Sequence, residues 1–558
     1  MSDEVGGHRL SAYAWRRAHA TGCHRSVEYL LLSGGVCAAA FATTWPYARV
    51  FTSHVVDHID PLFSMWRLAW FSHALRRGEH LLHANIFYPE PSTFLFSDAT
   101  LLQGAMALPA HSVGIGLPAV YNALLFFGLI SSGVAIYWLA TGLQITRSAA
   151  VLAAIVFSIA PYRIEHLMHL ELQWVAPSVV ALGSFYYMLF APRWKYGVIL
   201  AACVSLQFLA CVYYAVFLLP ILVVLALSAA TVLPDRGMTV RVAVLAAAMT
   251  AMVTLPIASL YRAQETRVGE RPIEDIAAYS ATPRNYLASP SENVLYGGTA
   301  DHLGSGERRM FPGVVALAFA TVGLFSARRR IAIAALLVVL LSLDLSFGLN
   351  GLIYPRLLDW WPVLRGLRAP ARYGVFVLAG VAILAALGYE ALVQRVRWRY
   401  FGFVIAPLAI AAALVEYRSP QHRLLEVDQD PAVYRFLNQR PQGVVLEFPV
   451  PTRIGAENFD AQYVFWSTKH WNKLVNGYSG YYPPSYEITL QRLQSFPDDD
   501  SLALLRERDV RYVVVHLEYL ELSRQTDLLA ALLAQNELQT LGSYSDWMGR
   551  AAVFELTK

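Results

Sequence analysis

Long apolar segments dominate the hydropathy pattern of this chain. A helix needs about 20 apolar residues to cross a bilayer, and segments of that order recur along the first three quarters of the sequence. They lie at residues 29–47, 119–143, 148–160, 174–189, 196–210, 212–232, 242–260, 313–326, 331–349, 373–392 and 401–415. The pattern predicts a polytopic α-helical membrane protein with about eleven transmembrane helices.

The pattern changes after residue 417, where short apolar runs alternate with turn residues and short helical repeats. Strands are expected at 443–448, Val510–His516 and 551–556, and helices at 431–437, 501–506 and 527–533. About 140 residues is an ordinary domain size. We therefore divide the chain into a membrane domain at 1–417 and a C-terminal α/β domain at 418–558.

Basic residues in alternate short loops predict the orientation. They are Arg147, then Arg193 and Lys195, then Arg236 and Arg241, then Arg328, Arg329 and Arg330, then Arg395, Arg397 and Arg399. By the positive-inside rule these loops and the N-terminus are cytoplasmic. Residues 1–26 resemble a basic n-region, but no convincing cleavage site follows, so the first helix is expected to be retained. Loops 48–118, 262–310 and 350–372 and the C-terminal domain then face the periplasm or the cell exterior, as in a protein of the bacterial inner membrane.

Composition agrees with a membrane protein. The chain is 56% hydrophobic and 15% charged, with a mean hydropathy of +0.42, whereas about a quarter of the residues in soluble domains are charged. The net charge of +4 lies in short clusters beside apolar segments, so nucleic acid is not an expected partner. The four cysteines have no metal-ligand spacing and predict neither a zinc site nor a disulfide framework.

The first outer loop, 48–118, carries the leading catalytic candidates, Asp57 and Asp60. The helical repeat at 61–77 predicts an interfacial helix with Trp66 and Trp70 at headgroup depth. We interpret Asp60, helped by Asp57, as the group that performs acid–base or metal chemistry on a lipid-linked substrate. The alternative is that the two carboxylates only cap the helix.

A divalent cation, Mg²⁺ or Mn²⁺, is a second expectation for this loop because such ions prefer oxygen ligands. Asp60 and Asp98 are the candidate ligands, and Glu90 adds to the carboxylate count. The alternative is that Glu90 belongs to a rigid turn and that Asp98 is an N-cap. A second amphipathic helix is expected at 101–113.

Two further outer loops carry candidates for binding a phosphate or pyrophosphate. Arg163, His166 and His169 have helical spacing and could share one face. Arg368 and Arg372, with Arg365, run against the positive-inside trend, which anion binding would explain. The alternatives are snorkelling side chains and contact with lipid headgroups. Asp344, near the outer end of an apolar segment, is expected to face a cavity or to pair with one of these arginines.

An aromatic, glycine-rich and proline-rich segment at 476–486 interrupts the C-terminal domain. Asn476, Tyr478 and Tyr481 could stack on and hydrogen-bond to a sugar, or the segment could simply dock the domain on the membrane part. The chain contains no Walker loop, no Gly-x-Ser-x-Gly, no His-Glu-x-x-His and no dinucleotide fingerprint.

Together these segments resemble the GT-C superfamily of integral-membrane glycosyltransferases, and more closely a bacterial family within it. The resemblance extends over nearly the whole chain. It is carried by Asp60 with 66–70, and by 84–90, 97–98, 160–163, 368–372 and 476–480. These motifs are typical of the family more than of one reaction, and Asp57 lies outside the match.

The resemblance implies a polyprenyl-phosphate sugar donor and transfer of a hexose or pentose, with inversion, to a glycan, lipid or protein acceptor at the outer face of the membrane. In that role Asp60 would be a general base or would hold a cation or the acceptor, while Arg368 and Arg372 stabilise the departing phosphate. The competing class is a non-catalytic transporter of lipid-linked glycans or a polysaccharide assembly factor. The internal symmetry common in transporters is not evident in the sequence.

Overall fold

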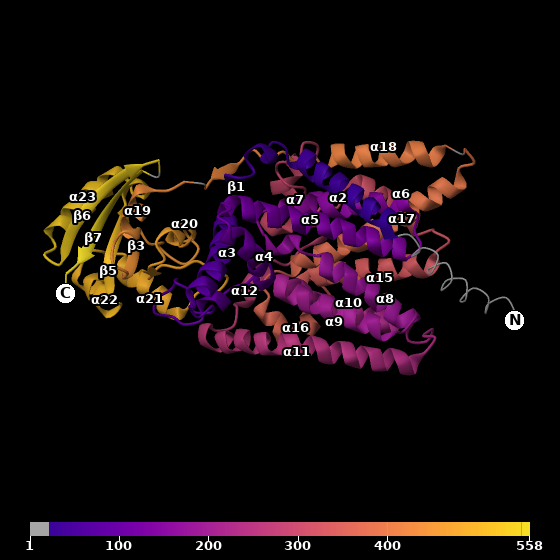
Figure 1. Cartoon of the computed structure of the whole chain (residues 1–558), viewed down its shortest axis with the longest axis horizontal. Coiled ribbons are helices and arrows are strands. Elements are labelled where there is room, and N and C mark those ends of the chain that lie inside the picture. The colour runs from indigo at the N-terminus through magenta and orange to yellow at the C-terminus, as the bar shows by residue number, and fades with distance from the viewer. Residues whose placement is uncertain (1–21, 399, 428, 548, 558) are drawn as a thin grey trace.

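The computed structural model describes residues 22–398, 400–427, 429–547 and 549–557. It consists of a large helix bundle and a smaller α/β domain at one end of it (Figure 1). We call the end of the bundle that contacts this domain the domain end. The last bundle helix, α18 (Phe401–Glu416), ends one residue before the boundary expected at residue 417.

Among the described residues, seven helical stretches are long and apolar enough to cross a membrane, which confirms a polytopic helical protein. They contain α2 (Gly22–Thr44), α5 (Leu117–Gly142), α6 (Arg147–Ile159), α8 (Ala176–Phe190), α10 (Val212–Ala229), α11 (Arg236–Val268) and α17 (Gly374–Arg395). The other predicted segments form the shorter or more polar helices α9 (Trp194–Ala210), α14 (Val314–Gly323), α15 (Arg329–Ser346) and α18 (Phe401–Glu416). The number of helices that actually span stays a prediction.

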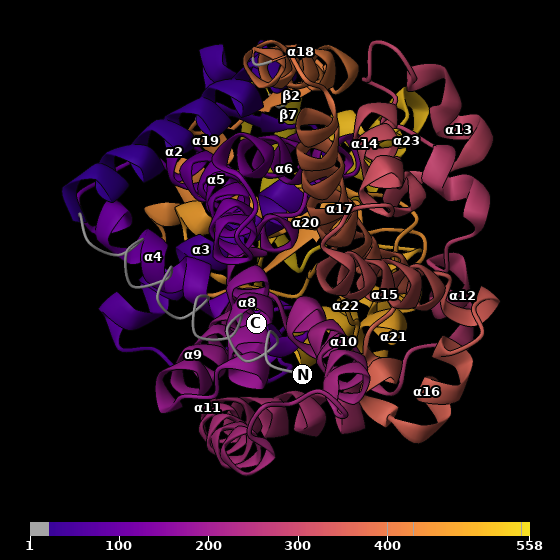
Figure 2. The ribbon, with the colours of Figure 1, turned by 90° about the vertical axis from the view of Figure 1, so that its right-hand side faces the viewer.

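Helix α17 lies inside the bundle, with α14, α15 and α6 packed around it (Figure 2). All its residues from Gly374 to Glu390 are buried. The contact with α14 depends on small residues, because a Cβ atom at Gly388 would lie 1.8 Å from the carbonyl oxygen of Phe319. Close backbone approach of this kind is a common way for helices to associate in membranes. In contrast, α11 lies at the edge of the bundle (Figure 2).

The first loop folds into α3 (Ile59–Arg77) and α4 (Leu101–Ser112), close to the predicted bounds. The prediction that Trp66 and Trp70 sit among lipid headgroups is wrong. Both indoles are almost fully buried, at 0% and 2% exposure, and they donate hydrogen bonds to Asn85 and to the carbonyl oxygen of Leu81. The helix packs against α4 and against α20 (Phe459–Trp466) of the C-terminal domain, so its apolar face meets protein instead of membrane.

The C-terminal domain contains a five-stranded mixed sheet in the order β4-β3-β5-β7-β6. β3 (Val444–Phe448), β5 (Val510–His516) and β7 (Gly549–Leu556) confirm the predicted strands, and β4 (Lys473–Leu474) and β6 (Leu538–Asp546) were not predicted. The first three strands in this order are parallel, and β7 pairs antiparallel with β5 and β6. The helices of the domain are α19 (Ala432–Asn438), α20 (Phe459–Trp466), α21 (Pro484–Leu493), α22 (Asp499–Glu507) and α23 (Leu522–Ala534).

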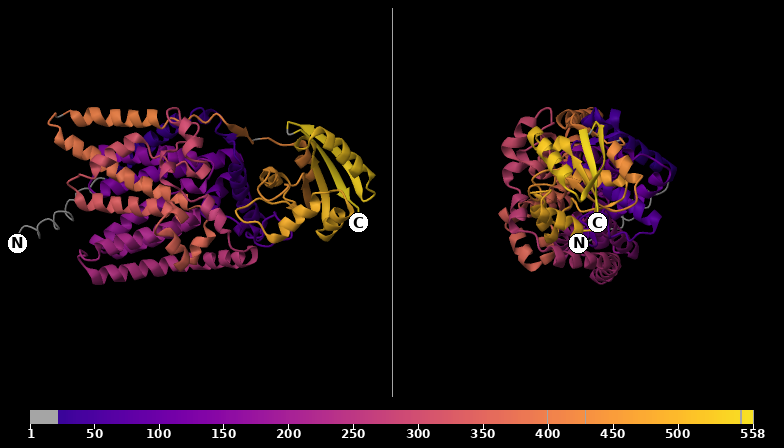
Figure 3. Two further views of the ribbon diagram at one scale, coloured as in Figure 1. Left: turned by 180° about the vertical axis from the view of Figure 1, so that it is seen from behind. Right: turned by 90° about the vertical axis from the view of Figure 1, so that its left-hand side faces the viewer.

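Backbone pairing joins this domain to the first loop. β1 (His54–Val56) pairs antiparallel with β2 (Leu424–Glu426). Further along the loop, the amide of Leu474 in β4 donates to the carbonyl of Asn85 (2.7 Å), and the amide of Tyr88 donates back to Leu474 (2.8 Å). The loop therefore continues the sheet beyond β4, and the domain sits directly over the end of the bundle (Figure 3).

Short helices complete the connections. They are α7 (Pro161–Glu165), α12 (Ile273–Ala278), α13 (Ala300–Leu303) and α16 (Tyr354–Trp360). Asp344, at the end of α15, forms no ion pair with an arginine among the described residues, contrary to one of the two expectations. Its two carboxylate oxygens accept hydrogen bonds from the amides of Leu352 and Ile353 (both 2.8 Å), so it fixes the turn that follows the helix.

Candidate active site

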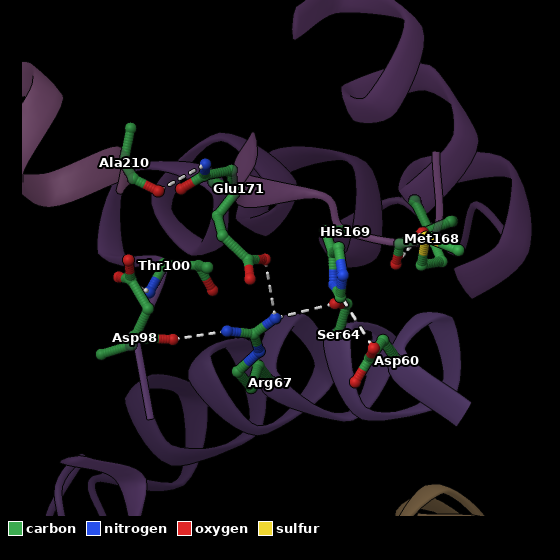
Figure 4. Close-up of polar contacts among 12 residues, drawn as sticks. Asp60, Ser64, Arg67, Asp98, Thr100, Met168, His169, Glu171 and Ala210 are labelled. Carbon is green, nitrogen blue, oxygen red and sulfur yellow. Dashed lines mark hydrogen bonds and ion pairs between the residues drawn. The ribbon is translucent and has the colours of Figure 1, made fainter. Parts of the chain in front are cut away.

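Asp60 lies in the first turn of α3, where the helix begins at the domain end of the bundle. His58 is the N-cap residue of the helix, and its Nδ1 lies 3.2 Å from the Asp60 amide nitrogen. Asp60 Oδ2 is 3.3 Å from His58 Nδ1 and 3.3 Å from His169 Nδ1, and Oδ1 accepts a hydrogen bond from the Tyr478 hydroxyl at 3.0 Å. Figure 4 shows the carboxylate pointing toward His169. With 23% of its side chain exposed, Asp60 can still be reached from outside the protein.

A line of alternating acidic and basic side chains continues from Asp60. His169 Nε2 lies 3.7 Å from Glu307 Oε1, and Glu307 accepts two hydrogen bonds, of 2.6 and 2.7 Å, from the Arg372 guanidinium. Glu307 was not predicted from the sequence. It lies in a three-residue 3-10 helix, Gly306–Arg308, too short to leave a periodic pattern in the sequence. Only the folded chain reveals that Glu307 lies next to His169.

We call the side chains around Asp60 the cluster; they are Asp60, His58, His169, Tyr478, Glu307 and Arg372. The cluster holds its carboxylates ionised. Burial opposes ionisation of Asp60, but the charges of His169 and His58 and the hydrogen bonds from His58 and Tyr478 outweigh it and hold the pKa of Asp60 well below its usual range. Burial likewise opposes ionisation of Glu307, and Arg372 outweighs it and lowers the pKa of Glu307.

The pKa values of the two histidines beside Asp60 shift in opposite directions. Burial lowers the pKa of His169, against the pull of Asp60 and Glu307. Burial also acts against protonation of His58, but the hydrogen bond and the charge of Asp60 prevail and raise the pKa of His58. His169 is therefore mostly neutral at pH 7 and could accept a proton.

Asp98 has a different environment from Asp60. Its Oδ2 accepts a hydrogen bond from the Val212 amide (2.8 Å) at the start of α10, and its Oδ1 one from the Thr100 amide (3.5 Å). Burial and the nearby Glu171 raise the pKa of Asp98 to about 7. Arg67 lies between Asp98 and Asp60 and pairs with Glu171 at 3.1 Å (Figure 4). Asp60 and Asp98 thus do not face a common space, and among the described residues no group of three or more His, Cys, Asp or Glu side chains is arranged to hold a metal ion.

Of the predicted trio Arg163, His166 and His169, only His169 reaches Asp60. The helix that would align them, α7, ends at Glu165. Arg163 is 1% exposed and donates to the backbone carbonyls of Leu172 (3.1 Å) and Gln173 (2.9 Å). Its guanidinium therefore orders the loop that carries His169. These contacts do not support a role for Arg163 in binding phosphate. His166 is buried, with Nδ1 2.8 Å from the carbonyl oxygen of Tyr162.

Arg368 and Arg372 differ although they are four residues apart. Arg372 is fully engaged with Glu307, whereas none of the ion pairs among the described residues involves Arg368. The Arg368 guanidinium lies over the Tyr279 ring, 5.1 Å from its centroid. Arg368 is close enough to the cluster for its charge to act on Tyr478. Burial raises the pKa of the Tyr478 hydroxyl, and the positive charge of Arg368 opposes that rise. Arg368 is thus a cation at the site without an acidic partner.

Arg271 was not predicted from the sequence. It stacks 3.8 Å from the centroid of Tyr481 and donates to the carbonyl of Gly366. Tyr481 itself donates to the same carbonyl at 3.0 Å, so these two side chains order the segment just before Arg368.

Asp57 and Asn476 contribute in other ways. Asp57 is exposed, and its amide donates to the Arg423 carbonyl, so it marks the end of β1 and does not face the cluster. Asn476 is fully buried and bonds to the backbone of Glu447 and to Asp460. It supports the segment that delivers Tyr478 to Asp60. The backbone there is tight, because a Cβ atom at Gly477 would lie 2.4 Å from the Phe87 ring.

Several solved structures with a similar fold are glycosyltransferases. The chain superposes on the arabinofuranosyltransferase AftD from Mycobacteria with a TM-score of 0.64 at 14% identity, covering 95% of this chain and 40% of AftD. It matches the archaeal oligosaccharyltransferase AglB from Archaeoglobus fulgidus, in complex with an inhibitory peptide and a dolichol-phosphate, with a TM-score of 0.54 at 14% identity, covering 96% and 74% of the two chains.

A third match is ArnT from Cupriavidus metallidurans bound to undecaprenyl phosphate. Its TM-score is 0.51 at 11% identity, and 96% of this chain and 98% of ArnT are covered. No family model and no curated protein matches the sequence.

These likenesses show the fold. The chain is a multi-pass membrane protein with the GT-C fold, which confirms the fold class and the resemblance seen in the sequence. It spans about two fifths of the length of AftD. At such low identities the likeness shows the fold but not the reaction.

Proposed function

We propose that this protein is a glycosyltransferase that transfers a sugar from a polyprenyl-phosphate donor to an acceptor hydroxyl or amide at the domain end of the bundle. The observation that carries the proposal is a partly exposed, ionised carboxylate, Asp60, bonded to Tyr478, together with a cation, Arg368, whose charge also acts on Tyr478 and which forms no ion pair among the described residues. Neighbours with the same fold bind dolichol phosphate and undecaprenyl phosphate, which supports a lipid-linked donor.

The geometry suits a direct displacement. The acceptor group hydrogen-bonds to Asp60 and attacks the anomeric carbon, and its proton passes to the Asp60–His169 pair, whose facing atoms are 3.3 Å apart. The bond from the anomeric carbon to the phosphate oxygen breaks, and its electron pair leaves with the polyprenyl phosphate. Arg368 stabilises the charge that develops on that phosphate. One displacement inverts the anomeric centre.

Each remaining group in the cluster has a supporting part. A carboxylate with a lowered pKa is a weak base by itself, so neutral His169 is needed to take up the proton. Glu307 and Arg372 fix the far side of the His169 ring, and Tyr478 fixes the other oxygen of Asp60. Arg372, expected from the sequence to bind the phosphate beside Arg368, serves instead to hold Glu307.

A divalent cation at Asp60 and Asp98 does not fit these residues. The Asp98 oxygens accept backbone hydrogen bonds, and His58 and His169 already approach Asp60 Oδ2. No step is therefore derived through a metal. The Mg²⁺ or Mn²⁺ dependence stays a prediction, which a chelation assay with re-addition of each ion tests.

The proposal extends to the cellular setting. With the N-terminus cytoplasmic, the cluster faces the periplasm or cell exterior, where nucleotide sugars are absent and a lipid-carried hexose or pentose is the available donor. Glycans, lipids and proteins are all candidate acceptors.

The deciding experiment is the Asp60→Asn variant. Asn keeps the size of the side chain but removes the charge, and transfer should fall by about 10²- to 10⁴-fold, the range for loss of acid–base catalysis. Mass spectrometry of lipids and surface glycans from cells with the wild-type chain, the variant or neither measures it. Asp57→Asn is the matched control and should retain transfer. Full activity of Asp60→Asn in correctly folded protein would overturn the proposal.

A further inference from the structure

A cleft lies near the end of α3 that is opposite to Asp60. Its volume is about 1240 Å³, and it opens between the end of α3, the first loop at 83–91 and the starts of β3, β4 and β5. Its lining includes Trp70, Tyr88, Trp471 and Lys473. Pockets for drug-sized ligands have about 300 to 1,000 Å³, so this cleft has room for a larger molecule.

Trp471 is the distinctive residue of this cleft. It has a left-handed backbone with φ of 54°, which is rare for a bulky side chain and is found where the surrounding structure enforces it. The amide of Trp471 donates to the carbonyl of Ser467 at 2.7 Å, and the ring of His73 stacks on the indole at 4.1 Å between centroids. The indole is thus held in a fixed position at the wall of the cleft.

The charges around the cleft nearly cancel. Its ionic lining comprises Glu79, Glu90, Asp509 and Glu555 on the acidic side and Lys473, Arg506 and Arg511 on the basic side. Several are already paired, as in Arg511 with Glu555 at 2.8 Å. A polyphosphate or an anionic lipid surface would require a net positive wall, and an apolar peptide would require fewer charges.

We propose that this cleft binds a neutral oligosaccharide. The C–H faces of sugar rings can pack on Trp471 and Tyr88, and the hydroxyls can bond to the surrounding carboxylate, amide and guanidinium groups. Trp70 follows Asp60 by ten residues on one helix, which is about 15 Å at 1.5 Å per residue. This proposal rests on the proposed function in assigning the cleft to the acceptor glycan, held several units away from the sugar that reacts.

The test uses the full chain in detergent and a panel of neutral hexose, deoxyhexose and pentose oligomers of one to about six units. Binding, measured by calorimetry, should strengthen with oligomer length. Trp471→Gly removes the ring and suits the left-handed backbone, so it should fold and lose at least tenfold in affinity. Trp547→Ala is the matched control, since Trp547 is a half-exposed indole of the same domain that does not line the cleft.

Failure of this idea and failure of the proposed function give different results. Asp60→Asn should bind the oligomers as wild type does while losing transfer. If wild type binds no oligomer of the panel, if affinity is independent of length, or if Trp471→Gly binds as wild type does, the glycan cleft is refuted whatever the activity of Asp60→Asn. Binding to anionic vesicles that depends on Trp471 would also refute it.

Discussion

The two ends of α3 both contact the C-terminal domain, but they do so with opposite chemistry. At its start, Asp60 meets Tyr478 within a line of charges that also includes His169 and Glu307. Near its other end, Trp70 and His73 meet Trp471 through aromatic rings at 5.8 and 4.1 Å. Arg67 and Glu171 separate the two environments.

The difference shows what each end can do. Buried ion pairs lose much of their hydration and contribute little net stability, so a line of them next to an opening is better explained by reactivity than by folding. A rigid aromatic surface with nearly balanced charge offers broad contact to a ligand. One helix thus positions a reactive end and a binding end against the same domain.

The largest effect beyond that of Asp60 is expected at Arg368. Arg368→Gln removes the cation that has no acidic partner, and transfer should fall about 10²-fold, as when one group that stabilises transition-state charge is lost. Arg365→Gln is the control. Arg365 is in the same segment, but its guanidinium lies 3.7 Å from the carboxylate of Glu270. The Arg365→Gln variant should therefore retain most of the wild-type activity. Initial rates with purified variants measure both, and equal rates would remove Arg368 from the reactive end.

A smaller effect, about tenfold at neutral pH, is expected for His169→Gln, and its pH profile is more informative than its rate. Burial lowers the pKa of His169, so wild-type activity should decline only below pH 6.5, where His169 becomes protonated and can no longer accept a proton. Asp60 stays ionised throughout this range because its pKa is also lowered. The acid decline should vanish in His169→Gln and persist in His58→Gln. A decline retained in His169→Gln would assign the proton to another group.

The smallest effect concerns stability at the support of Tyr478. Asp460 is buried and accepts hydrogen bonds from Asn476 and Tyr486, and burial raises its pKa to about 7. Between its unfolded pKa, near 4, and 7 the folded chain holds a proton that the unfolded chain has lost, so stability falls as pH rises. The Tm of the wild type should therefore drop from pH 5 to pH 7 by a few degrees more than that of Asp460→Asn. Parallel curves would show that Asp460 is ionised in the fold.

Much of the fold could be read from local pattern. Hydropathy located the bundle helices, and apolar runs located β3, β5 and β7, because burial of one segment is encoded within it. β4 has only two residues, and β6 has a single buried residue, so neither carries a clear apolar signal. The position of α3 was misjudged because an apolar helix face looks the same whether lipid or protein covers it.

The site was less predictable than the fold. Asp60 and Arg368 could be singled out because an acidic residue in a long loop and a basic residue on the expected outer face each stand out locally. The place of Glu307 depends on its contact with Arg372, which is 65 positions away, and the separation of Arg163 from the cluster depends on where the short helix α7 ends. Such contacts leave no periodic trace in the sequence.

The joining of the first loop to both β2 and β4 has a further consequence for engineering. The C-terminal domain is not a detachable module, because cutting the chain near residue 418 would expose an unpaired sheet edge and strip Tyr478 from Asp60. A chimera that exchanges this domain with that of a related protein would need to carry residues 54–96 along with it, so the two distant stretches should be treated as a single inherited unit.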